Sequence, residues 1–238
     1  MYINKKLRDD GMKKLYLLLT IMMFSLVGCS QEDDSIQTKS YTSKEPVNSI
    51  KISEVDANTK LTISNDNDIH VKYWEGDHDK YKIEVENNAL LVEKVESNNE
   101  DLNLTDKTTE IQIPSKIYKN IDIKNLNGDI DVECIKGESM ILYSTNGNIE
   151  VEKTNNDKLD VKCENGDISI DSIEGKDISL CNNNGNIAGD INDKESEFDI
   201  RSKVENGENN LVDKTNNKGK KLTVQDDCGD VEIQFNFS

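Results

Sequence analysis

Apolar and polar residues alternate along the last half of the chain, the pattern of a β-strand with one buried face. Apolar residues lie six and four positions before a turn dipeptide, as Ile121 and Ile123 do before Asn127. The alternation resumes after the dipeptide with Ile130 and Val132. Asn-Gly marks a tight turn, because Gly adopts positive φ freely and Asn tolerates the left-handed conformation. Each unit therefore predicts two short strands on either side of a corner.

The corner dipeptides recur at nearly fixed spacing: the first four stand 19 residues apart, and the last two follow at steps of 22. A fixed period of this size indicates a solenoid, in which each rung buries its apolar face only by stacking on its neighbours. We expect all six corner glycines to be structural turn positions, and the first four to have positive φ. They are Gly128, Gly147, Gly166, Gly185, Gly207 and Gly229.

Two all-β topologies fit this pattern. In a parallel β-solenoid, a β-helix-like stack of 19–22-residue repeats, each rung hydrogen-bonds to the next. In an antiparallel meander or sandwich, every Asn-Gly closes a hairpin, which is its ordinary role. We favour the solenoid, because identical side-chain offsets over four consecutive repeats let Ile stack on Ile and Asn on Asn. A meander does not need that identity.

The polar stretches between repeats predict a second corner in each rung, for example at Lys136–Glu138 or Glu174–Lys176. The fifth repeat is irregular: Phe198 and Ile200 are shifted by two residues, and Asn209 stands where an Ile is expected. We expect a bulged or looped rung there.

The N-terminal segment has the form of a bacterial export signal. A basic stretch begins at Met12, and the run Leu15–Val27 is almost wholly apolar but too short to span a membrane. The ending Leu26–Cys29 looks like a lipobox, in which Cys29 is acylated and the chain is cut before it. We expect residues 1–28 to be a signal peptide whose true start is Met12. The alternatives are an ordinary signal peptide with a chance Cys, or a buried hydrophobic strand.

The remaining chain divides into a tether and one domain. Residues 29–48 are polar and predict a flexible, lipid-anchored tether. Residues 49–238 predict one β domain, with an irregular first part at 49–114 and regular repeats at 115–238. Asn65–Ile69 resembles a degenerate first corner, and Lys94–Thr109 predicts a loop. Less regular strands are expected around Ile50/Ile52, Leu61/Ile63, Ile69/Val71, Tyr81/Val85, Leu90/Val92 and Ile111/Ile113.

The charge balance limits the kinds of partner. The chain carries a net charge of −18, and removal of residues 1–28, with five basic and two acidic side chains, leaves −21. Nucleic-acid binding needs clustered Lys and Arg, so that class is excluded. An acidic surface is also repelled by anionic membranes, which leaves the lipid on Cys29 as the membrane contact. The charge indicates simple solubility or, more sharply, a cationic or cation-dependent partner.

Cysteine and histidine positions do not indicate a metal site. Four Cys remain besides Cys29, and three of them share the parity of buried strand residues, while Cys181 should point outward. They are Cys134, Cys163, Cys181 and Cys228. Their spacings are unlike those of zinc sites, and both His70 and His78 lie in a polar region far from any Cys. Small buried Cys is the simplest interpretation, although disulfides are left open.

The residues that follow the corner glycines form one column of the proposed stack. Their oxygens could share calcium between rungs, but Asp and Asn are also good corner residues that bond their own backbone. These corners lack the Gly-rich pattern of calcium-binding repeats, so we predict no metal and no cofactor. The column consists of Asp129, Asn148, Asp167, Asn186, Glu208 and Asp230.

The segment Ile111–Pro114, followed by Ile121–Ile123 and the repeated Asn-Gly-Asp/Asn-Ile corners, resembles the bacterial domain-of-unknown-function family called "putative adhesin". The resemblance spans roughly Ile50 to Phe237. It implies a β-solenoid-like domain on an envelope protein, with some members linked to envelope stress. It offers no catalytic residues to carry over.

Three functions follow as hypotheses. The first is a lipid-anchored surface protein on the extracytoplasmic face of the cell membrane, with a non-catalytic binding or structural role and an unidentified envelope or protein ligand. The second is an accessory factor in envelope-stress signalling. The third is a polysaccharide-acting enzyme, which would need convergent acid–base groups. Arg201 is the one Arg after processing, and no nucleophile–base motif is evident, so we expect no enzyme activity.

Overall fold

The computed structural model describes residues 36–97 and 107–236, which all belong to one compact unit. These residues form strands and a single 3-10 turn at Glu195–Glu197. Alternate residues of the strands point into a shared apolar core, as the period-two pattern requires. The signal peptide, Cys29 and part of the loop expected at Lys94–Thr109 lie outside the described residues.

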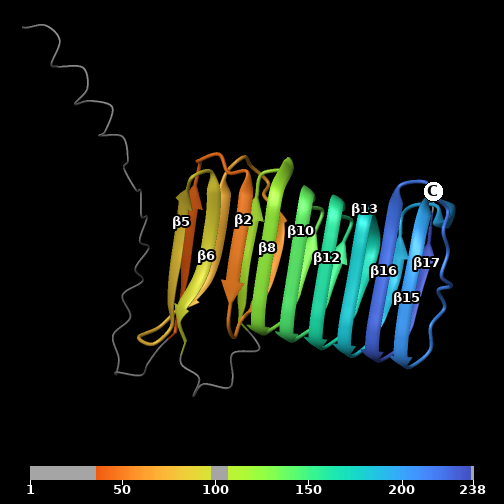
Figure 1. Ribbon diagram of the computed structural model, residues 1–238. Coiled ribbons are helices and arrows are strands. Elements are labelled where there is room, and N and C mark those ends of the chain that lie inside the picture. The colour runs from red at the N-terminus through yellow and green to blue at the C-terminus, as the bar shows by residue number, and fades with distance from the viewer. Residues whose placement is uncertain (1–35, 98–106, 237–238) are drawn as a thin grey trace, which may run out of the picture. The chain divides into compact units, whose positions relative to one another are not determined.

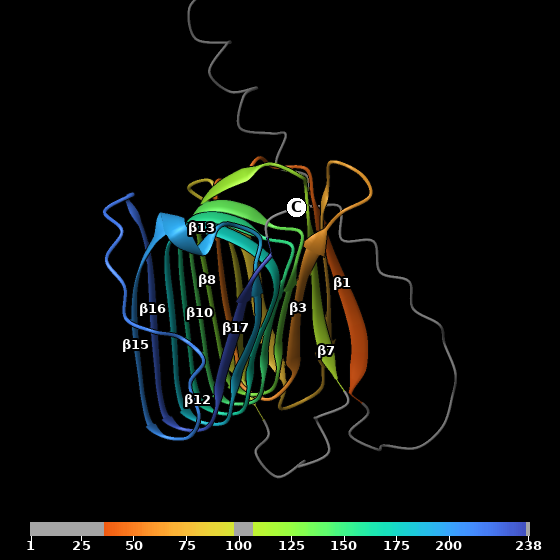
Figure 2. The same cartoon turned by 90° about the vertical axis from the view of Figure 1, so that its right-hand side faces the viewer.

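Two sheets face each other along the stack, with the core between them (Figures 1 and 2). Sheet 1 contains the longer strands. In spatial order they are β5 (Lys80–Glu86), β6 (Ala89–Glu96), β2 (Ser49–Glu54), β8 (Ile117–Asn127), β10 (Lys136–Asn146), β12 (Asn155–Asn165), the second half of β13 (Ile168–Asn184), β16 (Lys220–Cys228) and β15 (Phe198–Asn206).

Sheet 2 contains mostly shorter strands, and the first half of β13 belongs to it. In spatial order they are β1 (Gln37–Ser43), β4 (Ile69–Glu75), β7 (Thr108–Ile113), β3 (Asn58–Ile63), β9 (Ile130–Glu133), β11 (Ile149–Glu152), β13, β14 (Ile187–Ile191) and β17 (Val231–Phe235).

Pairing through the repeats is parallel and joins equivalent residues. Met140 lies opposite Ile121 on one side and Leu159 on the other. Antiparallel strand pairs lie near the start of the described chain, between β1 and β4, β4 and β7, and β5 and β6, and a single antiparallel bridge joins Ile200 and Lys214 near its end. The expectation of an all-β, solenoid-like fold is confirmed, and the hairpin meander is not the topology of the repeats.

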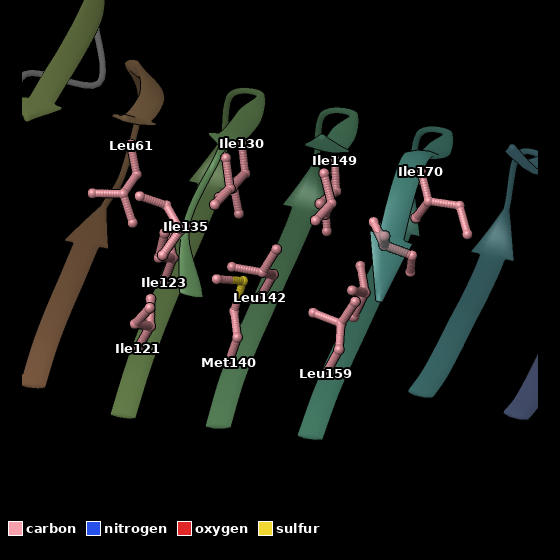
Figure 3. Close-up of a cluster of buried hydrophobic side chains, with 14 of the residues drawn as sticks. Leu61, Ile121, Ile123, Ile130, Ile135, Met140, Leu142, Ile149, Leu159 and Ile170 are labelled. Atoms are coloured by element: carbon pink, nitrogen blue, oxygen red, sulfur yellow. The ribbon is translucent and has the colours of Figure 1, made fainter. Parts of the chain in front are cut away.

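Stacked apolar columns form the core. One column on sheet 1 comprises Leu90, Ile50, Ile121, Met140, Leu159, Ile178, Leu222 and Ile200, all almost fully buried. Figure 3 shows Ile121, Met140 and Leu159 following one another from strand to strand, with Ile130 and Ile149 facing them from the other sheet. Each buried side chain of this size stabilises the fold by about 1.5–3 kcal/mol, so the stack supplies most of the driving force.

The rungs do not stack in chain order at either end. At the start, β2 lies between β6 and β8, although β6 follows β2 in the chain. At the end, β16 lies between β13 and β15, so that Cys228 is opposite both Asn184 and Asn206. The expected continuation of the repeats in chain order is therefore wrong for the last two rungs. Because every rung presents the same kind of column, a later rung can dock where an earlier one was expected.

The irregular repeat forms the outer end of the stack. Ile200 occupies the apolar column opposite Leu222, and the second strand of that rung shrinks to one bridge between Asn209 and Val231. The following residues, 210–219, which we call the strap, run back along the open edges. In the strap, Asn210 bonds both backbone groups of Ile233, at 2.8 and 3.0 Å. The rung is looped, as expected, but its role is to close the stack.

Several expected corners lie elsewhere. The residue stacked on Gly128 is Ala57, so the first corner is at Ala57–Asn58, and Asn65–Asp68 instead joins β3 to β4. The second corners are at Cys134, Lys153 and Ser172, with φ of 62°, 51° and 54°. One residue in the left-handed region suffices to turn the chain.

The glycines near the expected second corners lie inside strands. Gly137 belongs to β10, where a Cβ would stand 2.9 Å from Asn156 Oδ1. The glycine is needed for packing, because the buried Asn156 side chain of the next rung fills the space that a side chain would take.

Two further expectations need correction. The flexible tether cannot extend to residue 48, because Gln37–Ser43 forms β1 and pairs with β4 in register. Cys134 and Cys228 are exposed and only Cys163 is buried, because Cys134 turns the second corner and Cys228 takes the exposed corner position of Asn184. The four Cys that the structure describes are free thiols.

Candidate functional site

The corner column holds the rungs together through backbone approach. A Cβ on Gly147 would lie 2.3 Å from Gly128 O, and one on Gly166 would lie 2.5 Å from Gly147 O. Gly147, Gly166 and Gly185 have φ of 143°, 146° and 133°, whereas Gly128 lies outside that region. Close stacking of corner on corner, more than the turn alone, requires glycine here.

Asparagines before the glycines form a ladder on the surface. Asn146 Nδ2 donates to Asn127 Oδ1 at 2.9 Å, Asn165 Nδ2 to Asn146 Oδ1 at 3.1 Å, and Asn184 Nδ2 to Asn165 Oδ1 at 3.1 Å. Each amide also donates to a backbone carbonyl of the neighbouring rung. Cys228 interrupts the row of amides, because it has no amide to donate to Asn184, but Asn206 Nδ2 still donates to Cys228 Sγ at 3.8 Å and to Asp227 O at 3.0 Å.

The column proposed as a possible calcium site bonds to the backbone of the adjacent rung. Asp129 Oδ1 accepts the N–H of Asn148 at 2.7 Å, and Asp167 Oδ1 accepts that of Asn186 at 2.7 Å. The same bond joins Asn186 to Asp230 and Asp230 to Glu208. These side chains therefore serve as rung-to-rung links, and not as caps of their own backbone. Among the residues described, no group of three or more His, Cys, Asp or Glu could hold a metal ion.

The outer face of sheet 2 is strongly acidic. Its outward positions place Glu133 opposite Glu152, and Glu152 opposite Asp171, on three successive strands. A second row pairs Asp131 with Glu150. Neighbouring parallel strands lie about 4.8 Å apart, so like charges stand side by side and destabilise the sheet. We call these five residues the acidic face.

A surface hollow of about 270 Å³ opens beside the acidic face. Its wall includes Lys60, which forms an ion pair with Asp131 and has a pKa raised by that hydrogen bond. Lys153 is paired with Glu152 in the same way. These two lysines leave most of the carboxylate charge of the face exposed to a ligand.

The outer face of sheet 1 is balanced in charge by comparison. Lys162 lies 3.8 Å from Glu164 and 5.6 Å from the centre of the Tyr143 ring, whose hydroxyl donates to the same carboxylate at 2.5 Å. Lys158 and Asp160 approach to 3.8 Å. Acidic and basic side chains on this face lie in pairs of opposite charge, which is typical of a solvated surface.

A buried polar cluster joins β2, β5, β6 and β7, and sequence analysis missed it. Glu54 Oε2 accepts bonds from Tyr81 Oη at 2.7 Å and Thr109 Oγ1 at 2.8 Å. Lys94 forms ion pairs with Asp56 and, at 2.8 Å, with Asp79. These residues come from distant positions with no characteristic spacing. Only the odd placement of Glu54 in an alternating strand could have signalled the cluster.

The cluster has perturbed ionisation but little access. Burial raises the pKa of Glu54, although three hydrogen bonds act against that shift. Burial alone would lower the pKa of Lys94, but its bonds to the two aspartates raise it overall. Glu54 and Thr109 are 3% and 0% exposed, so a substrate cannot reach them. The cluster acts as a clamp between the antiparallel strands β5 and β6 and the neighbouring strands β2 and β7.

Arg201 and the histidines serve structural contacts. The guanidinium of Arg201 donates to the carbonyls of Ile200 and Lys214 and to Thr215, binding the strap. His70 lies 3.0 Å from Asp66, and His78 lies 3.9 Å from Glu96. In the described part of the chain, no helix is long and apolar enough to cross a membrane.

The fold defines the class as a β-solenoid-like protein with stacked glycine corners. The model of the Toastrack DUF4097 family matches residues 47–238, and the chain belongs to this family. No curated protein is significantly similar to the chain.

Several solved structures are similar. One is a putative cell adhesion protein from Clostridium sporogenes, with 15% identity, a TM-score of 0.49, and coverage of 84% of this chain and 100% of that chain. Another is a putative adhesin from Parabacteroides merdae, with 16% identity, a TM-score of 0.47, and coverage of 83% and 80%. A third, from Bacteroides fragilis, has 11% identity, a TM-score of 0.40, and coverage of 84% and 99%.

Proposed function

We propose that the protein is a lipid-anchored, non-catalytic binding protein of the cell envelope, which presents the acidic face of sheet 2 to a cationic partner. Export and the anchor rest on the sequence: the signal at residues 1–28 and the lipobox that ends in Cys29. The mature chain would then be held at the extracytoplasmic face of the membrane by its lipid. Anionic lipids repel its acidic surface, which leaves the domain free to meet its ligand.

The observation that carries the binding role is the row Glu133–Glu152–Asp171. Like charges on adjacent strands cost stability, and polar residues without charge would solvate the face equally well. Destabilising arrangements are typical of sites retained for function. The balanced charges on sheet 1 provide the contrast, since that face carries acids and lysines in pairs.

A pull-down from native envelope with the full lipidated protein tests the binding role. The test variant carries Glu133→Gln, Glu152→Gln and Asp171→Asn, and the control carries Asp122→Asn, Asp160→Asn and Glu164→Gln on sheet 1. Both remove three charges. We expect the first variant to lose its captured partner while gaining about 0.5 kcal/mol of stability, and the control to retain the partner. Equal capture by both variants would contradict the assignment of the acidic face.

The anchor has a separate test. Wild-type protein should partition into the detergent phase and lack the mass of residues 1–28, whereas Cys29→Ala should be released or remain uncleaved. A Cys29→Ala protein that is processed and retained like wild type would contradict lipidation at this residue and leave the binding test unaffected.

A further inference from the structure

One inward position carries a small polar side chain on five neighbouring strands of sheet 1: β8, β10, β12, β13 and β16. Successive members lie opposite one another in the parallel register. All are at most 1% exposed. This buried polar column consists of Asn125, Ser144, Cys163, Asn182 and Asp226.

The first four members make equivalent hydrogen bonds. Each donates to the carbonyl oxygen of the corner residue on a neighbouring rung. The bonds are Asn125 Nδ2 to Ala57 O at 2.8 Å, Ser144 Oγ to Gly128 O at 3.4 Å, Cys163 Sγ to Gly147 O at 3.3 Å, and Asn182 Nδ2 to Gly166 O at 2.9 Å. The column therefore supplies a donor to each of these corner carbonyls.

Asp226 differs from the others because an ionised carboxylate has no proton to donate. Its Oδ1 accepts the N–H of Cys228 at 3.0 Å. Its Oδ2 is buried and has no hydrogen-bond partner. A buried acceptor in this state costs about 1–3 kcal/mol, more if it is charged.

The neighbour of Oδ2 is another acceptor. A Cβ built on Gly229 would lie 1.9 Å from Gly185 O and 3.1 Å from Asp226 Oδ2. The equivalent Cβ on Gly128 would lie 2.6 Å from Ala57 O and 2.9 Å from Asn125 Nδ2, two atoms that are hydrogen-bonded. Asp226 Oδ2 thus stands where the other members place their donor.

The surroundings favour the neutral acid. The register neighbours of Asp226 are Asn182 on β13 and Val204 on β15, which carry no charge. Burial raises the pKa of Asp226. The hydrogen bond from the Cys228 N–H acts against that shift, and the carboxylates of Asp227, Asp230 and Asp167 add to it, so the pKa is raised overall.

Two other groups near this joint lie on outer positions. The thiol of Cys181 on β13 is half-buried, and its pKa is also raised by burial. Lys203 and Glu205 on β15 are exposed and paired with each other. Neither the Lys203–Glu205 pair nor the Cys181 thiol neutralises the charge that Asp226 Oδ2 would carry.

We propose that Asp226 is a protonated carboxylic acid in the folded protein, donating Oδ2–H to Gly185 O, and that its ionisation loosens the joint between β13 and β16. Because β16 lies between β13 and β15, loosening this joint frees the last two rungs together. The C-terminal end of the stack is then a pH-sensitive device, tight in acid and weaker as the pH rises.

The sign follows from proton binding. Between the ordinary pKa of an aspartate and the raised pKa of Asp226, the folded state holds one proton more than the unfolded state. Stability therefore falls as the pH rises through that window, and the loss is complete above the raised pKa.

Thermal unfolding of the full chain from pH 4 to pH 8 tests the proposal. Asp226→Asn supplies a permanent donor, as Asn125 and Asn182 do. We expect its Tm at pH 8 to exceed that of wild type by about 2–4 °C, and the difference to shrink toward pH 4. Asp177→Asn, at an exposed outer position of β13, is the matched control and should follow wild type. A difference that is absent, reversed or constant across this range would overturn the proposal.

A second measurement does not depend on a variant that folds. The ¹³C carboxyl signal of Asp226 in the wild-type protein should titrate with a midpoint above the usual range for aspartate. A midpoint within or below that range would show an ionised carboxylate in the stack and overturn the proposal.

Discussion

The middle of the stack and its two ends are built by different rules. From β8 to β14 each rung follows its predecessor in the chain and lies beside it in space, with Asn on Asn and Gly on Gly. At both ends a later rung and an earlier one exchange places, and non-repeating elements close the open edges. Repetition thus specifies that rungs stack, while the ends specify where stacking stops.

The two ends stop in different ways. The first end uses antiparallel strands, with β5 on sheet 1 and β1 with β4 on sheet 2, and a buried ionic clamp. The second end uses the strap, whose side chains form hydrogen bonds with backbone groups of β15 and β17. An uncovered parallel edge is a template for another chain, so both devices prevent end-to-end association.

The largest expected effect is in the middle. Gly166→Val would place a Cβ 2.5 Å from Gly147 O at a φ of 146°, so we expect a loss of at least about 4 kcal/mol in urea unfolding. The control Gly76→Val meets mainly the flexible Ile36 side chain and should cost about 1 kcal/mol or less. Similar losses at both positions would refute close corner stacking.

The clamp at the first end should follow in size. Lys94→Met leaves the buried Asp79 and the partly buried Asp56 without their cation, which should cost about 3–5 kcal/mol. Lys72→Met removes the exposed pair with Glu110, which lies 2.7 Å away, and should cost less than about 1 kcal/mol. If the Lys94 variant unfolds at the same urea concentration as the Lys72 variant, the cluster is not a clamp.

The asparagine ladder should have a smaller effect. Asn165→Asp removes the donor to Asn146 and Thr145 while keeping the shape, and should cost about 1 kcal/mol. Asn183→Asp, on the outer face of β13, makes the same charge change and should be nearly neutral. Equal Tm values for the two variants would show that the ladder contributes nothing.

The strap should affect association more than stability. Asn210→Ala uncovers the backbone of Ile233, so we expect a loss near 1 kcal/mol together with concentration-dependent self-association in sedimentation velocity. Asn155→Ala, on β12 in the middle of the stack, removes one exposed hydrogen bond to Glu174 and serves as the control. A variant that sediments as wild type at every concentration would contradict the capping role.

Sequence reasoning was strongest where the chain repeats. The alternation around Ile121 and Ile130 predicted strands with one buried face, because successive side chains of a β-strand point to opposite faces of the sheet. The exchanged rungs could not be predicted, since equivalent columns make Leu222 as good a neighbour for Ile178 as Ile200 would be. The Glu54–Tyr81–Thr109 cluster was missed because its members meet only through topology. The second corners were misplaced because glycine at Gly137 serves packing and not turning.

The exchange of the last two rungs is the central claim, and a disulfide tests it directly. In a Cys134→Ser/Cys181→Ser background, Asn184→Cys stands opposite the native Cys228, with the strands about 4.8 Å apart. That spacing suits a disulfide, whereas the roughly 9.6 Å of two rungs does not. We expect mild oxidation to link positions 184 and 228 in the folded protein, as seen by peptide mass analysis. An Asn184→Cys/Asn206→Cys/Cys228→Ser variant that cross-links instead, with no link between 184 and 228, would contradict the account.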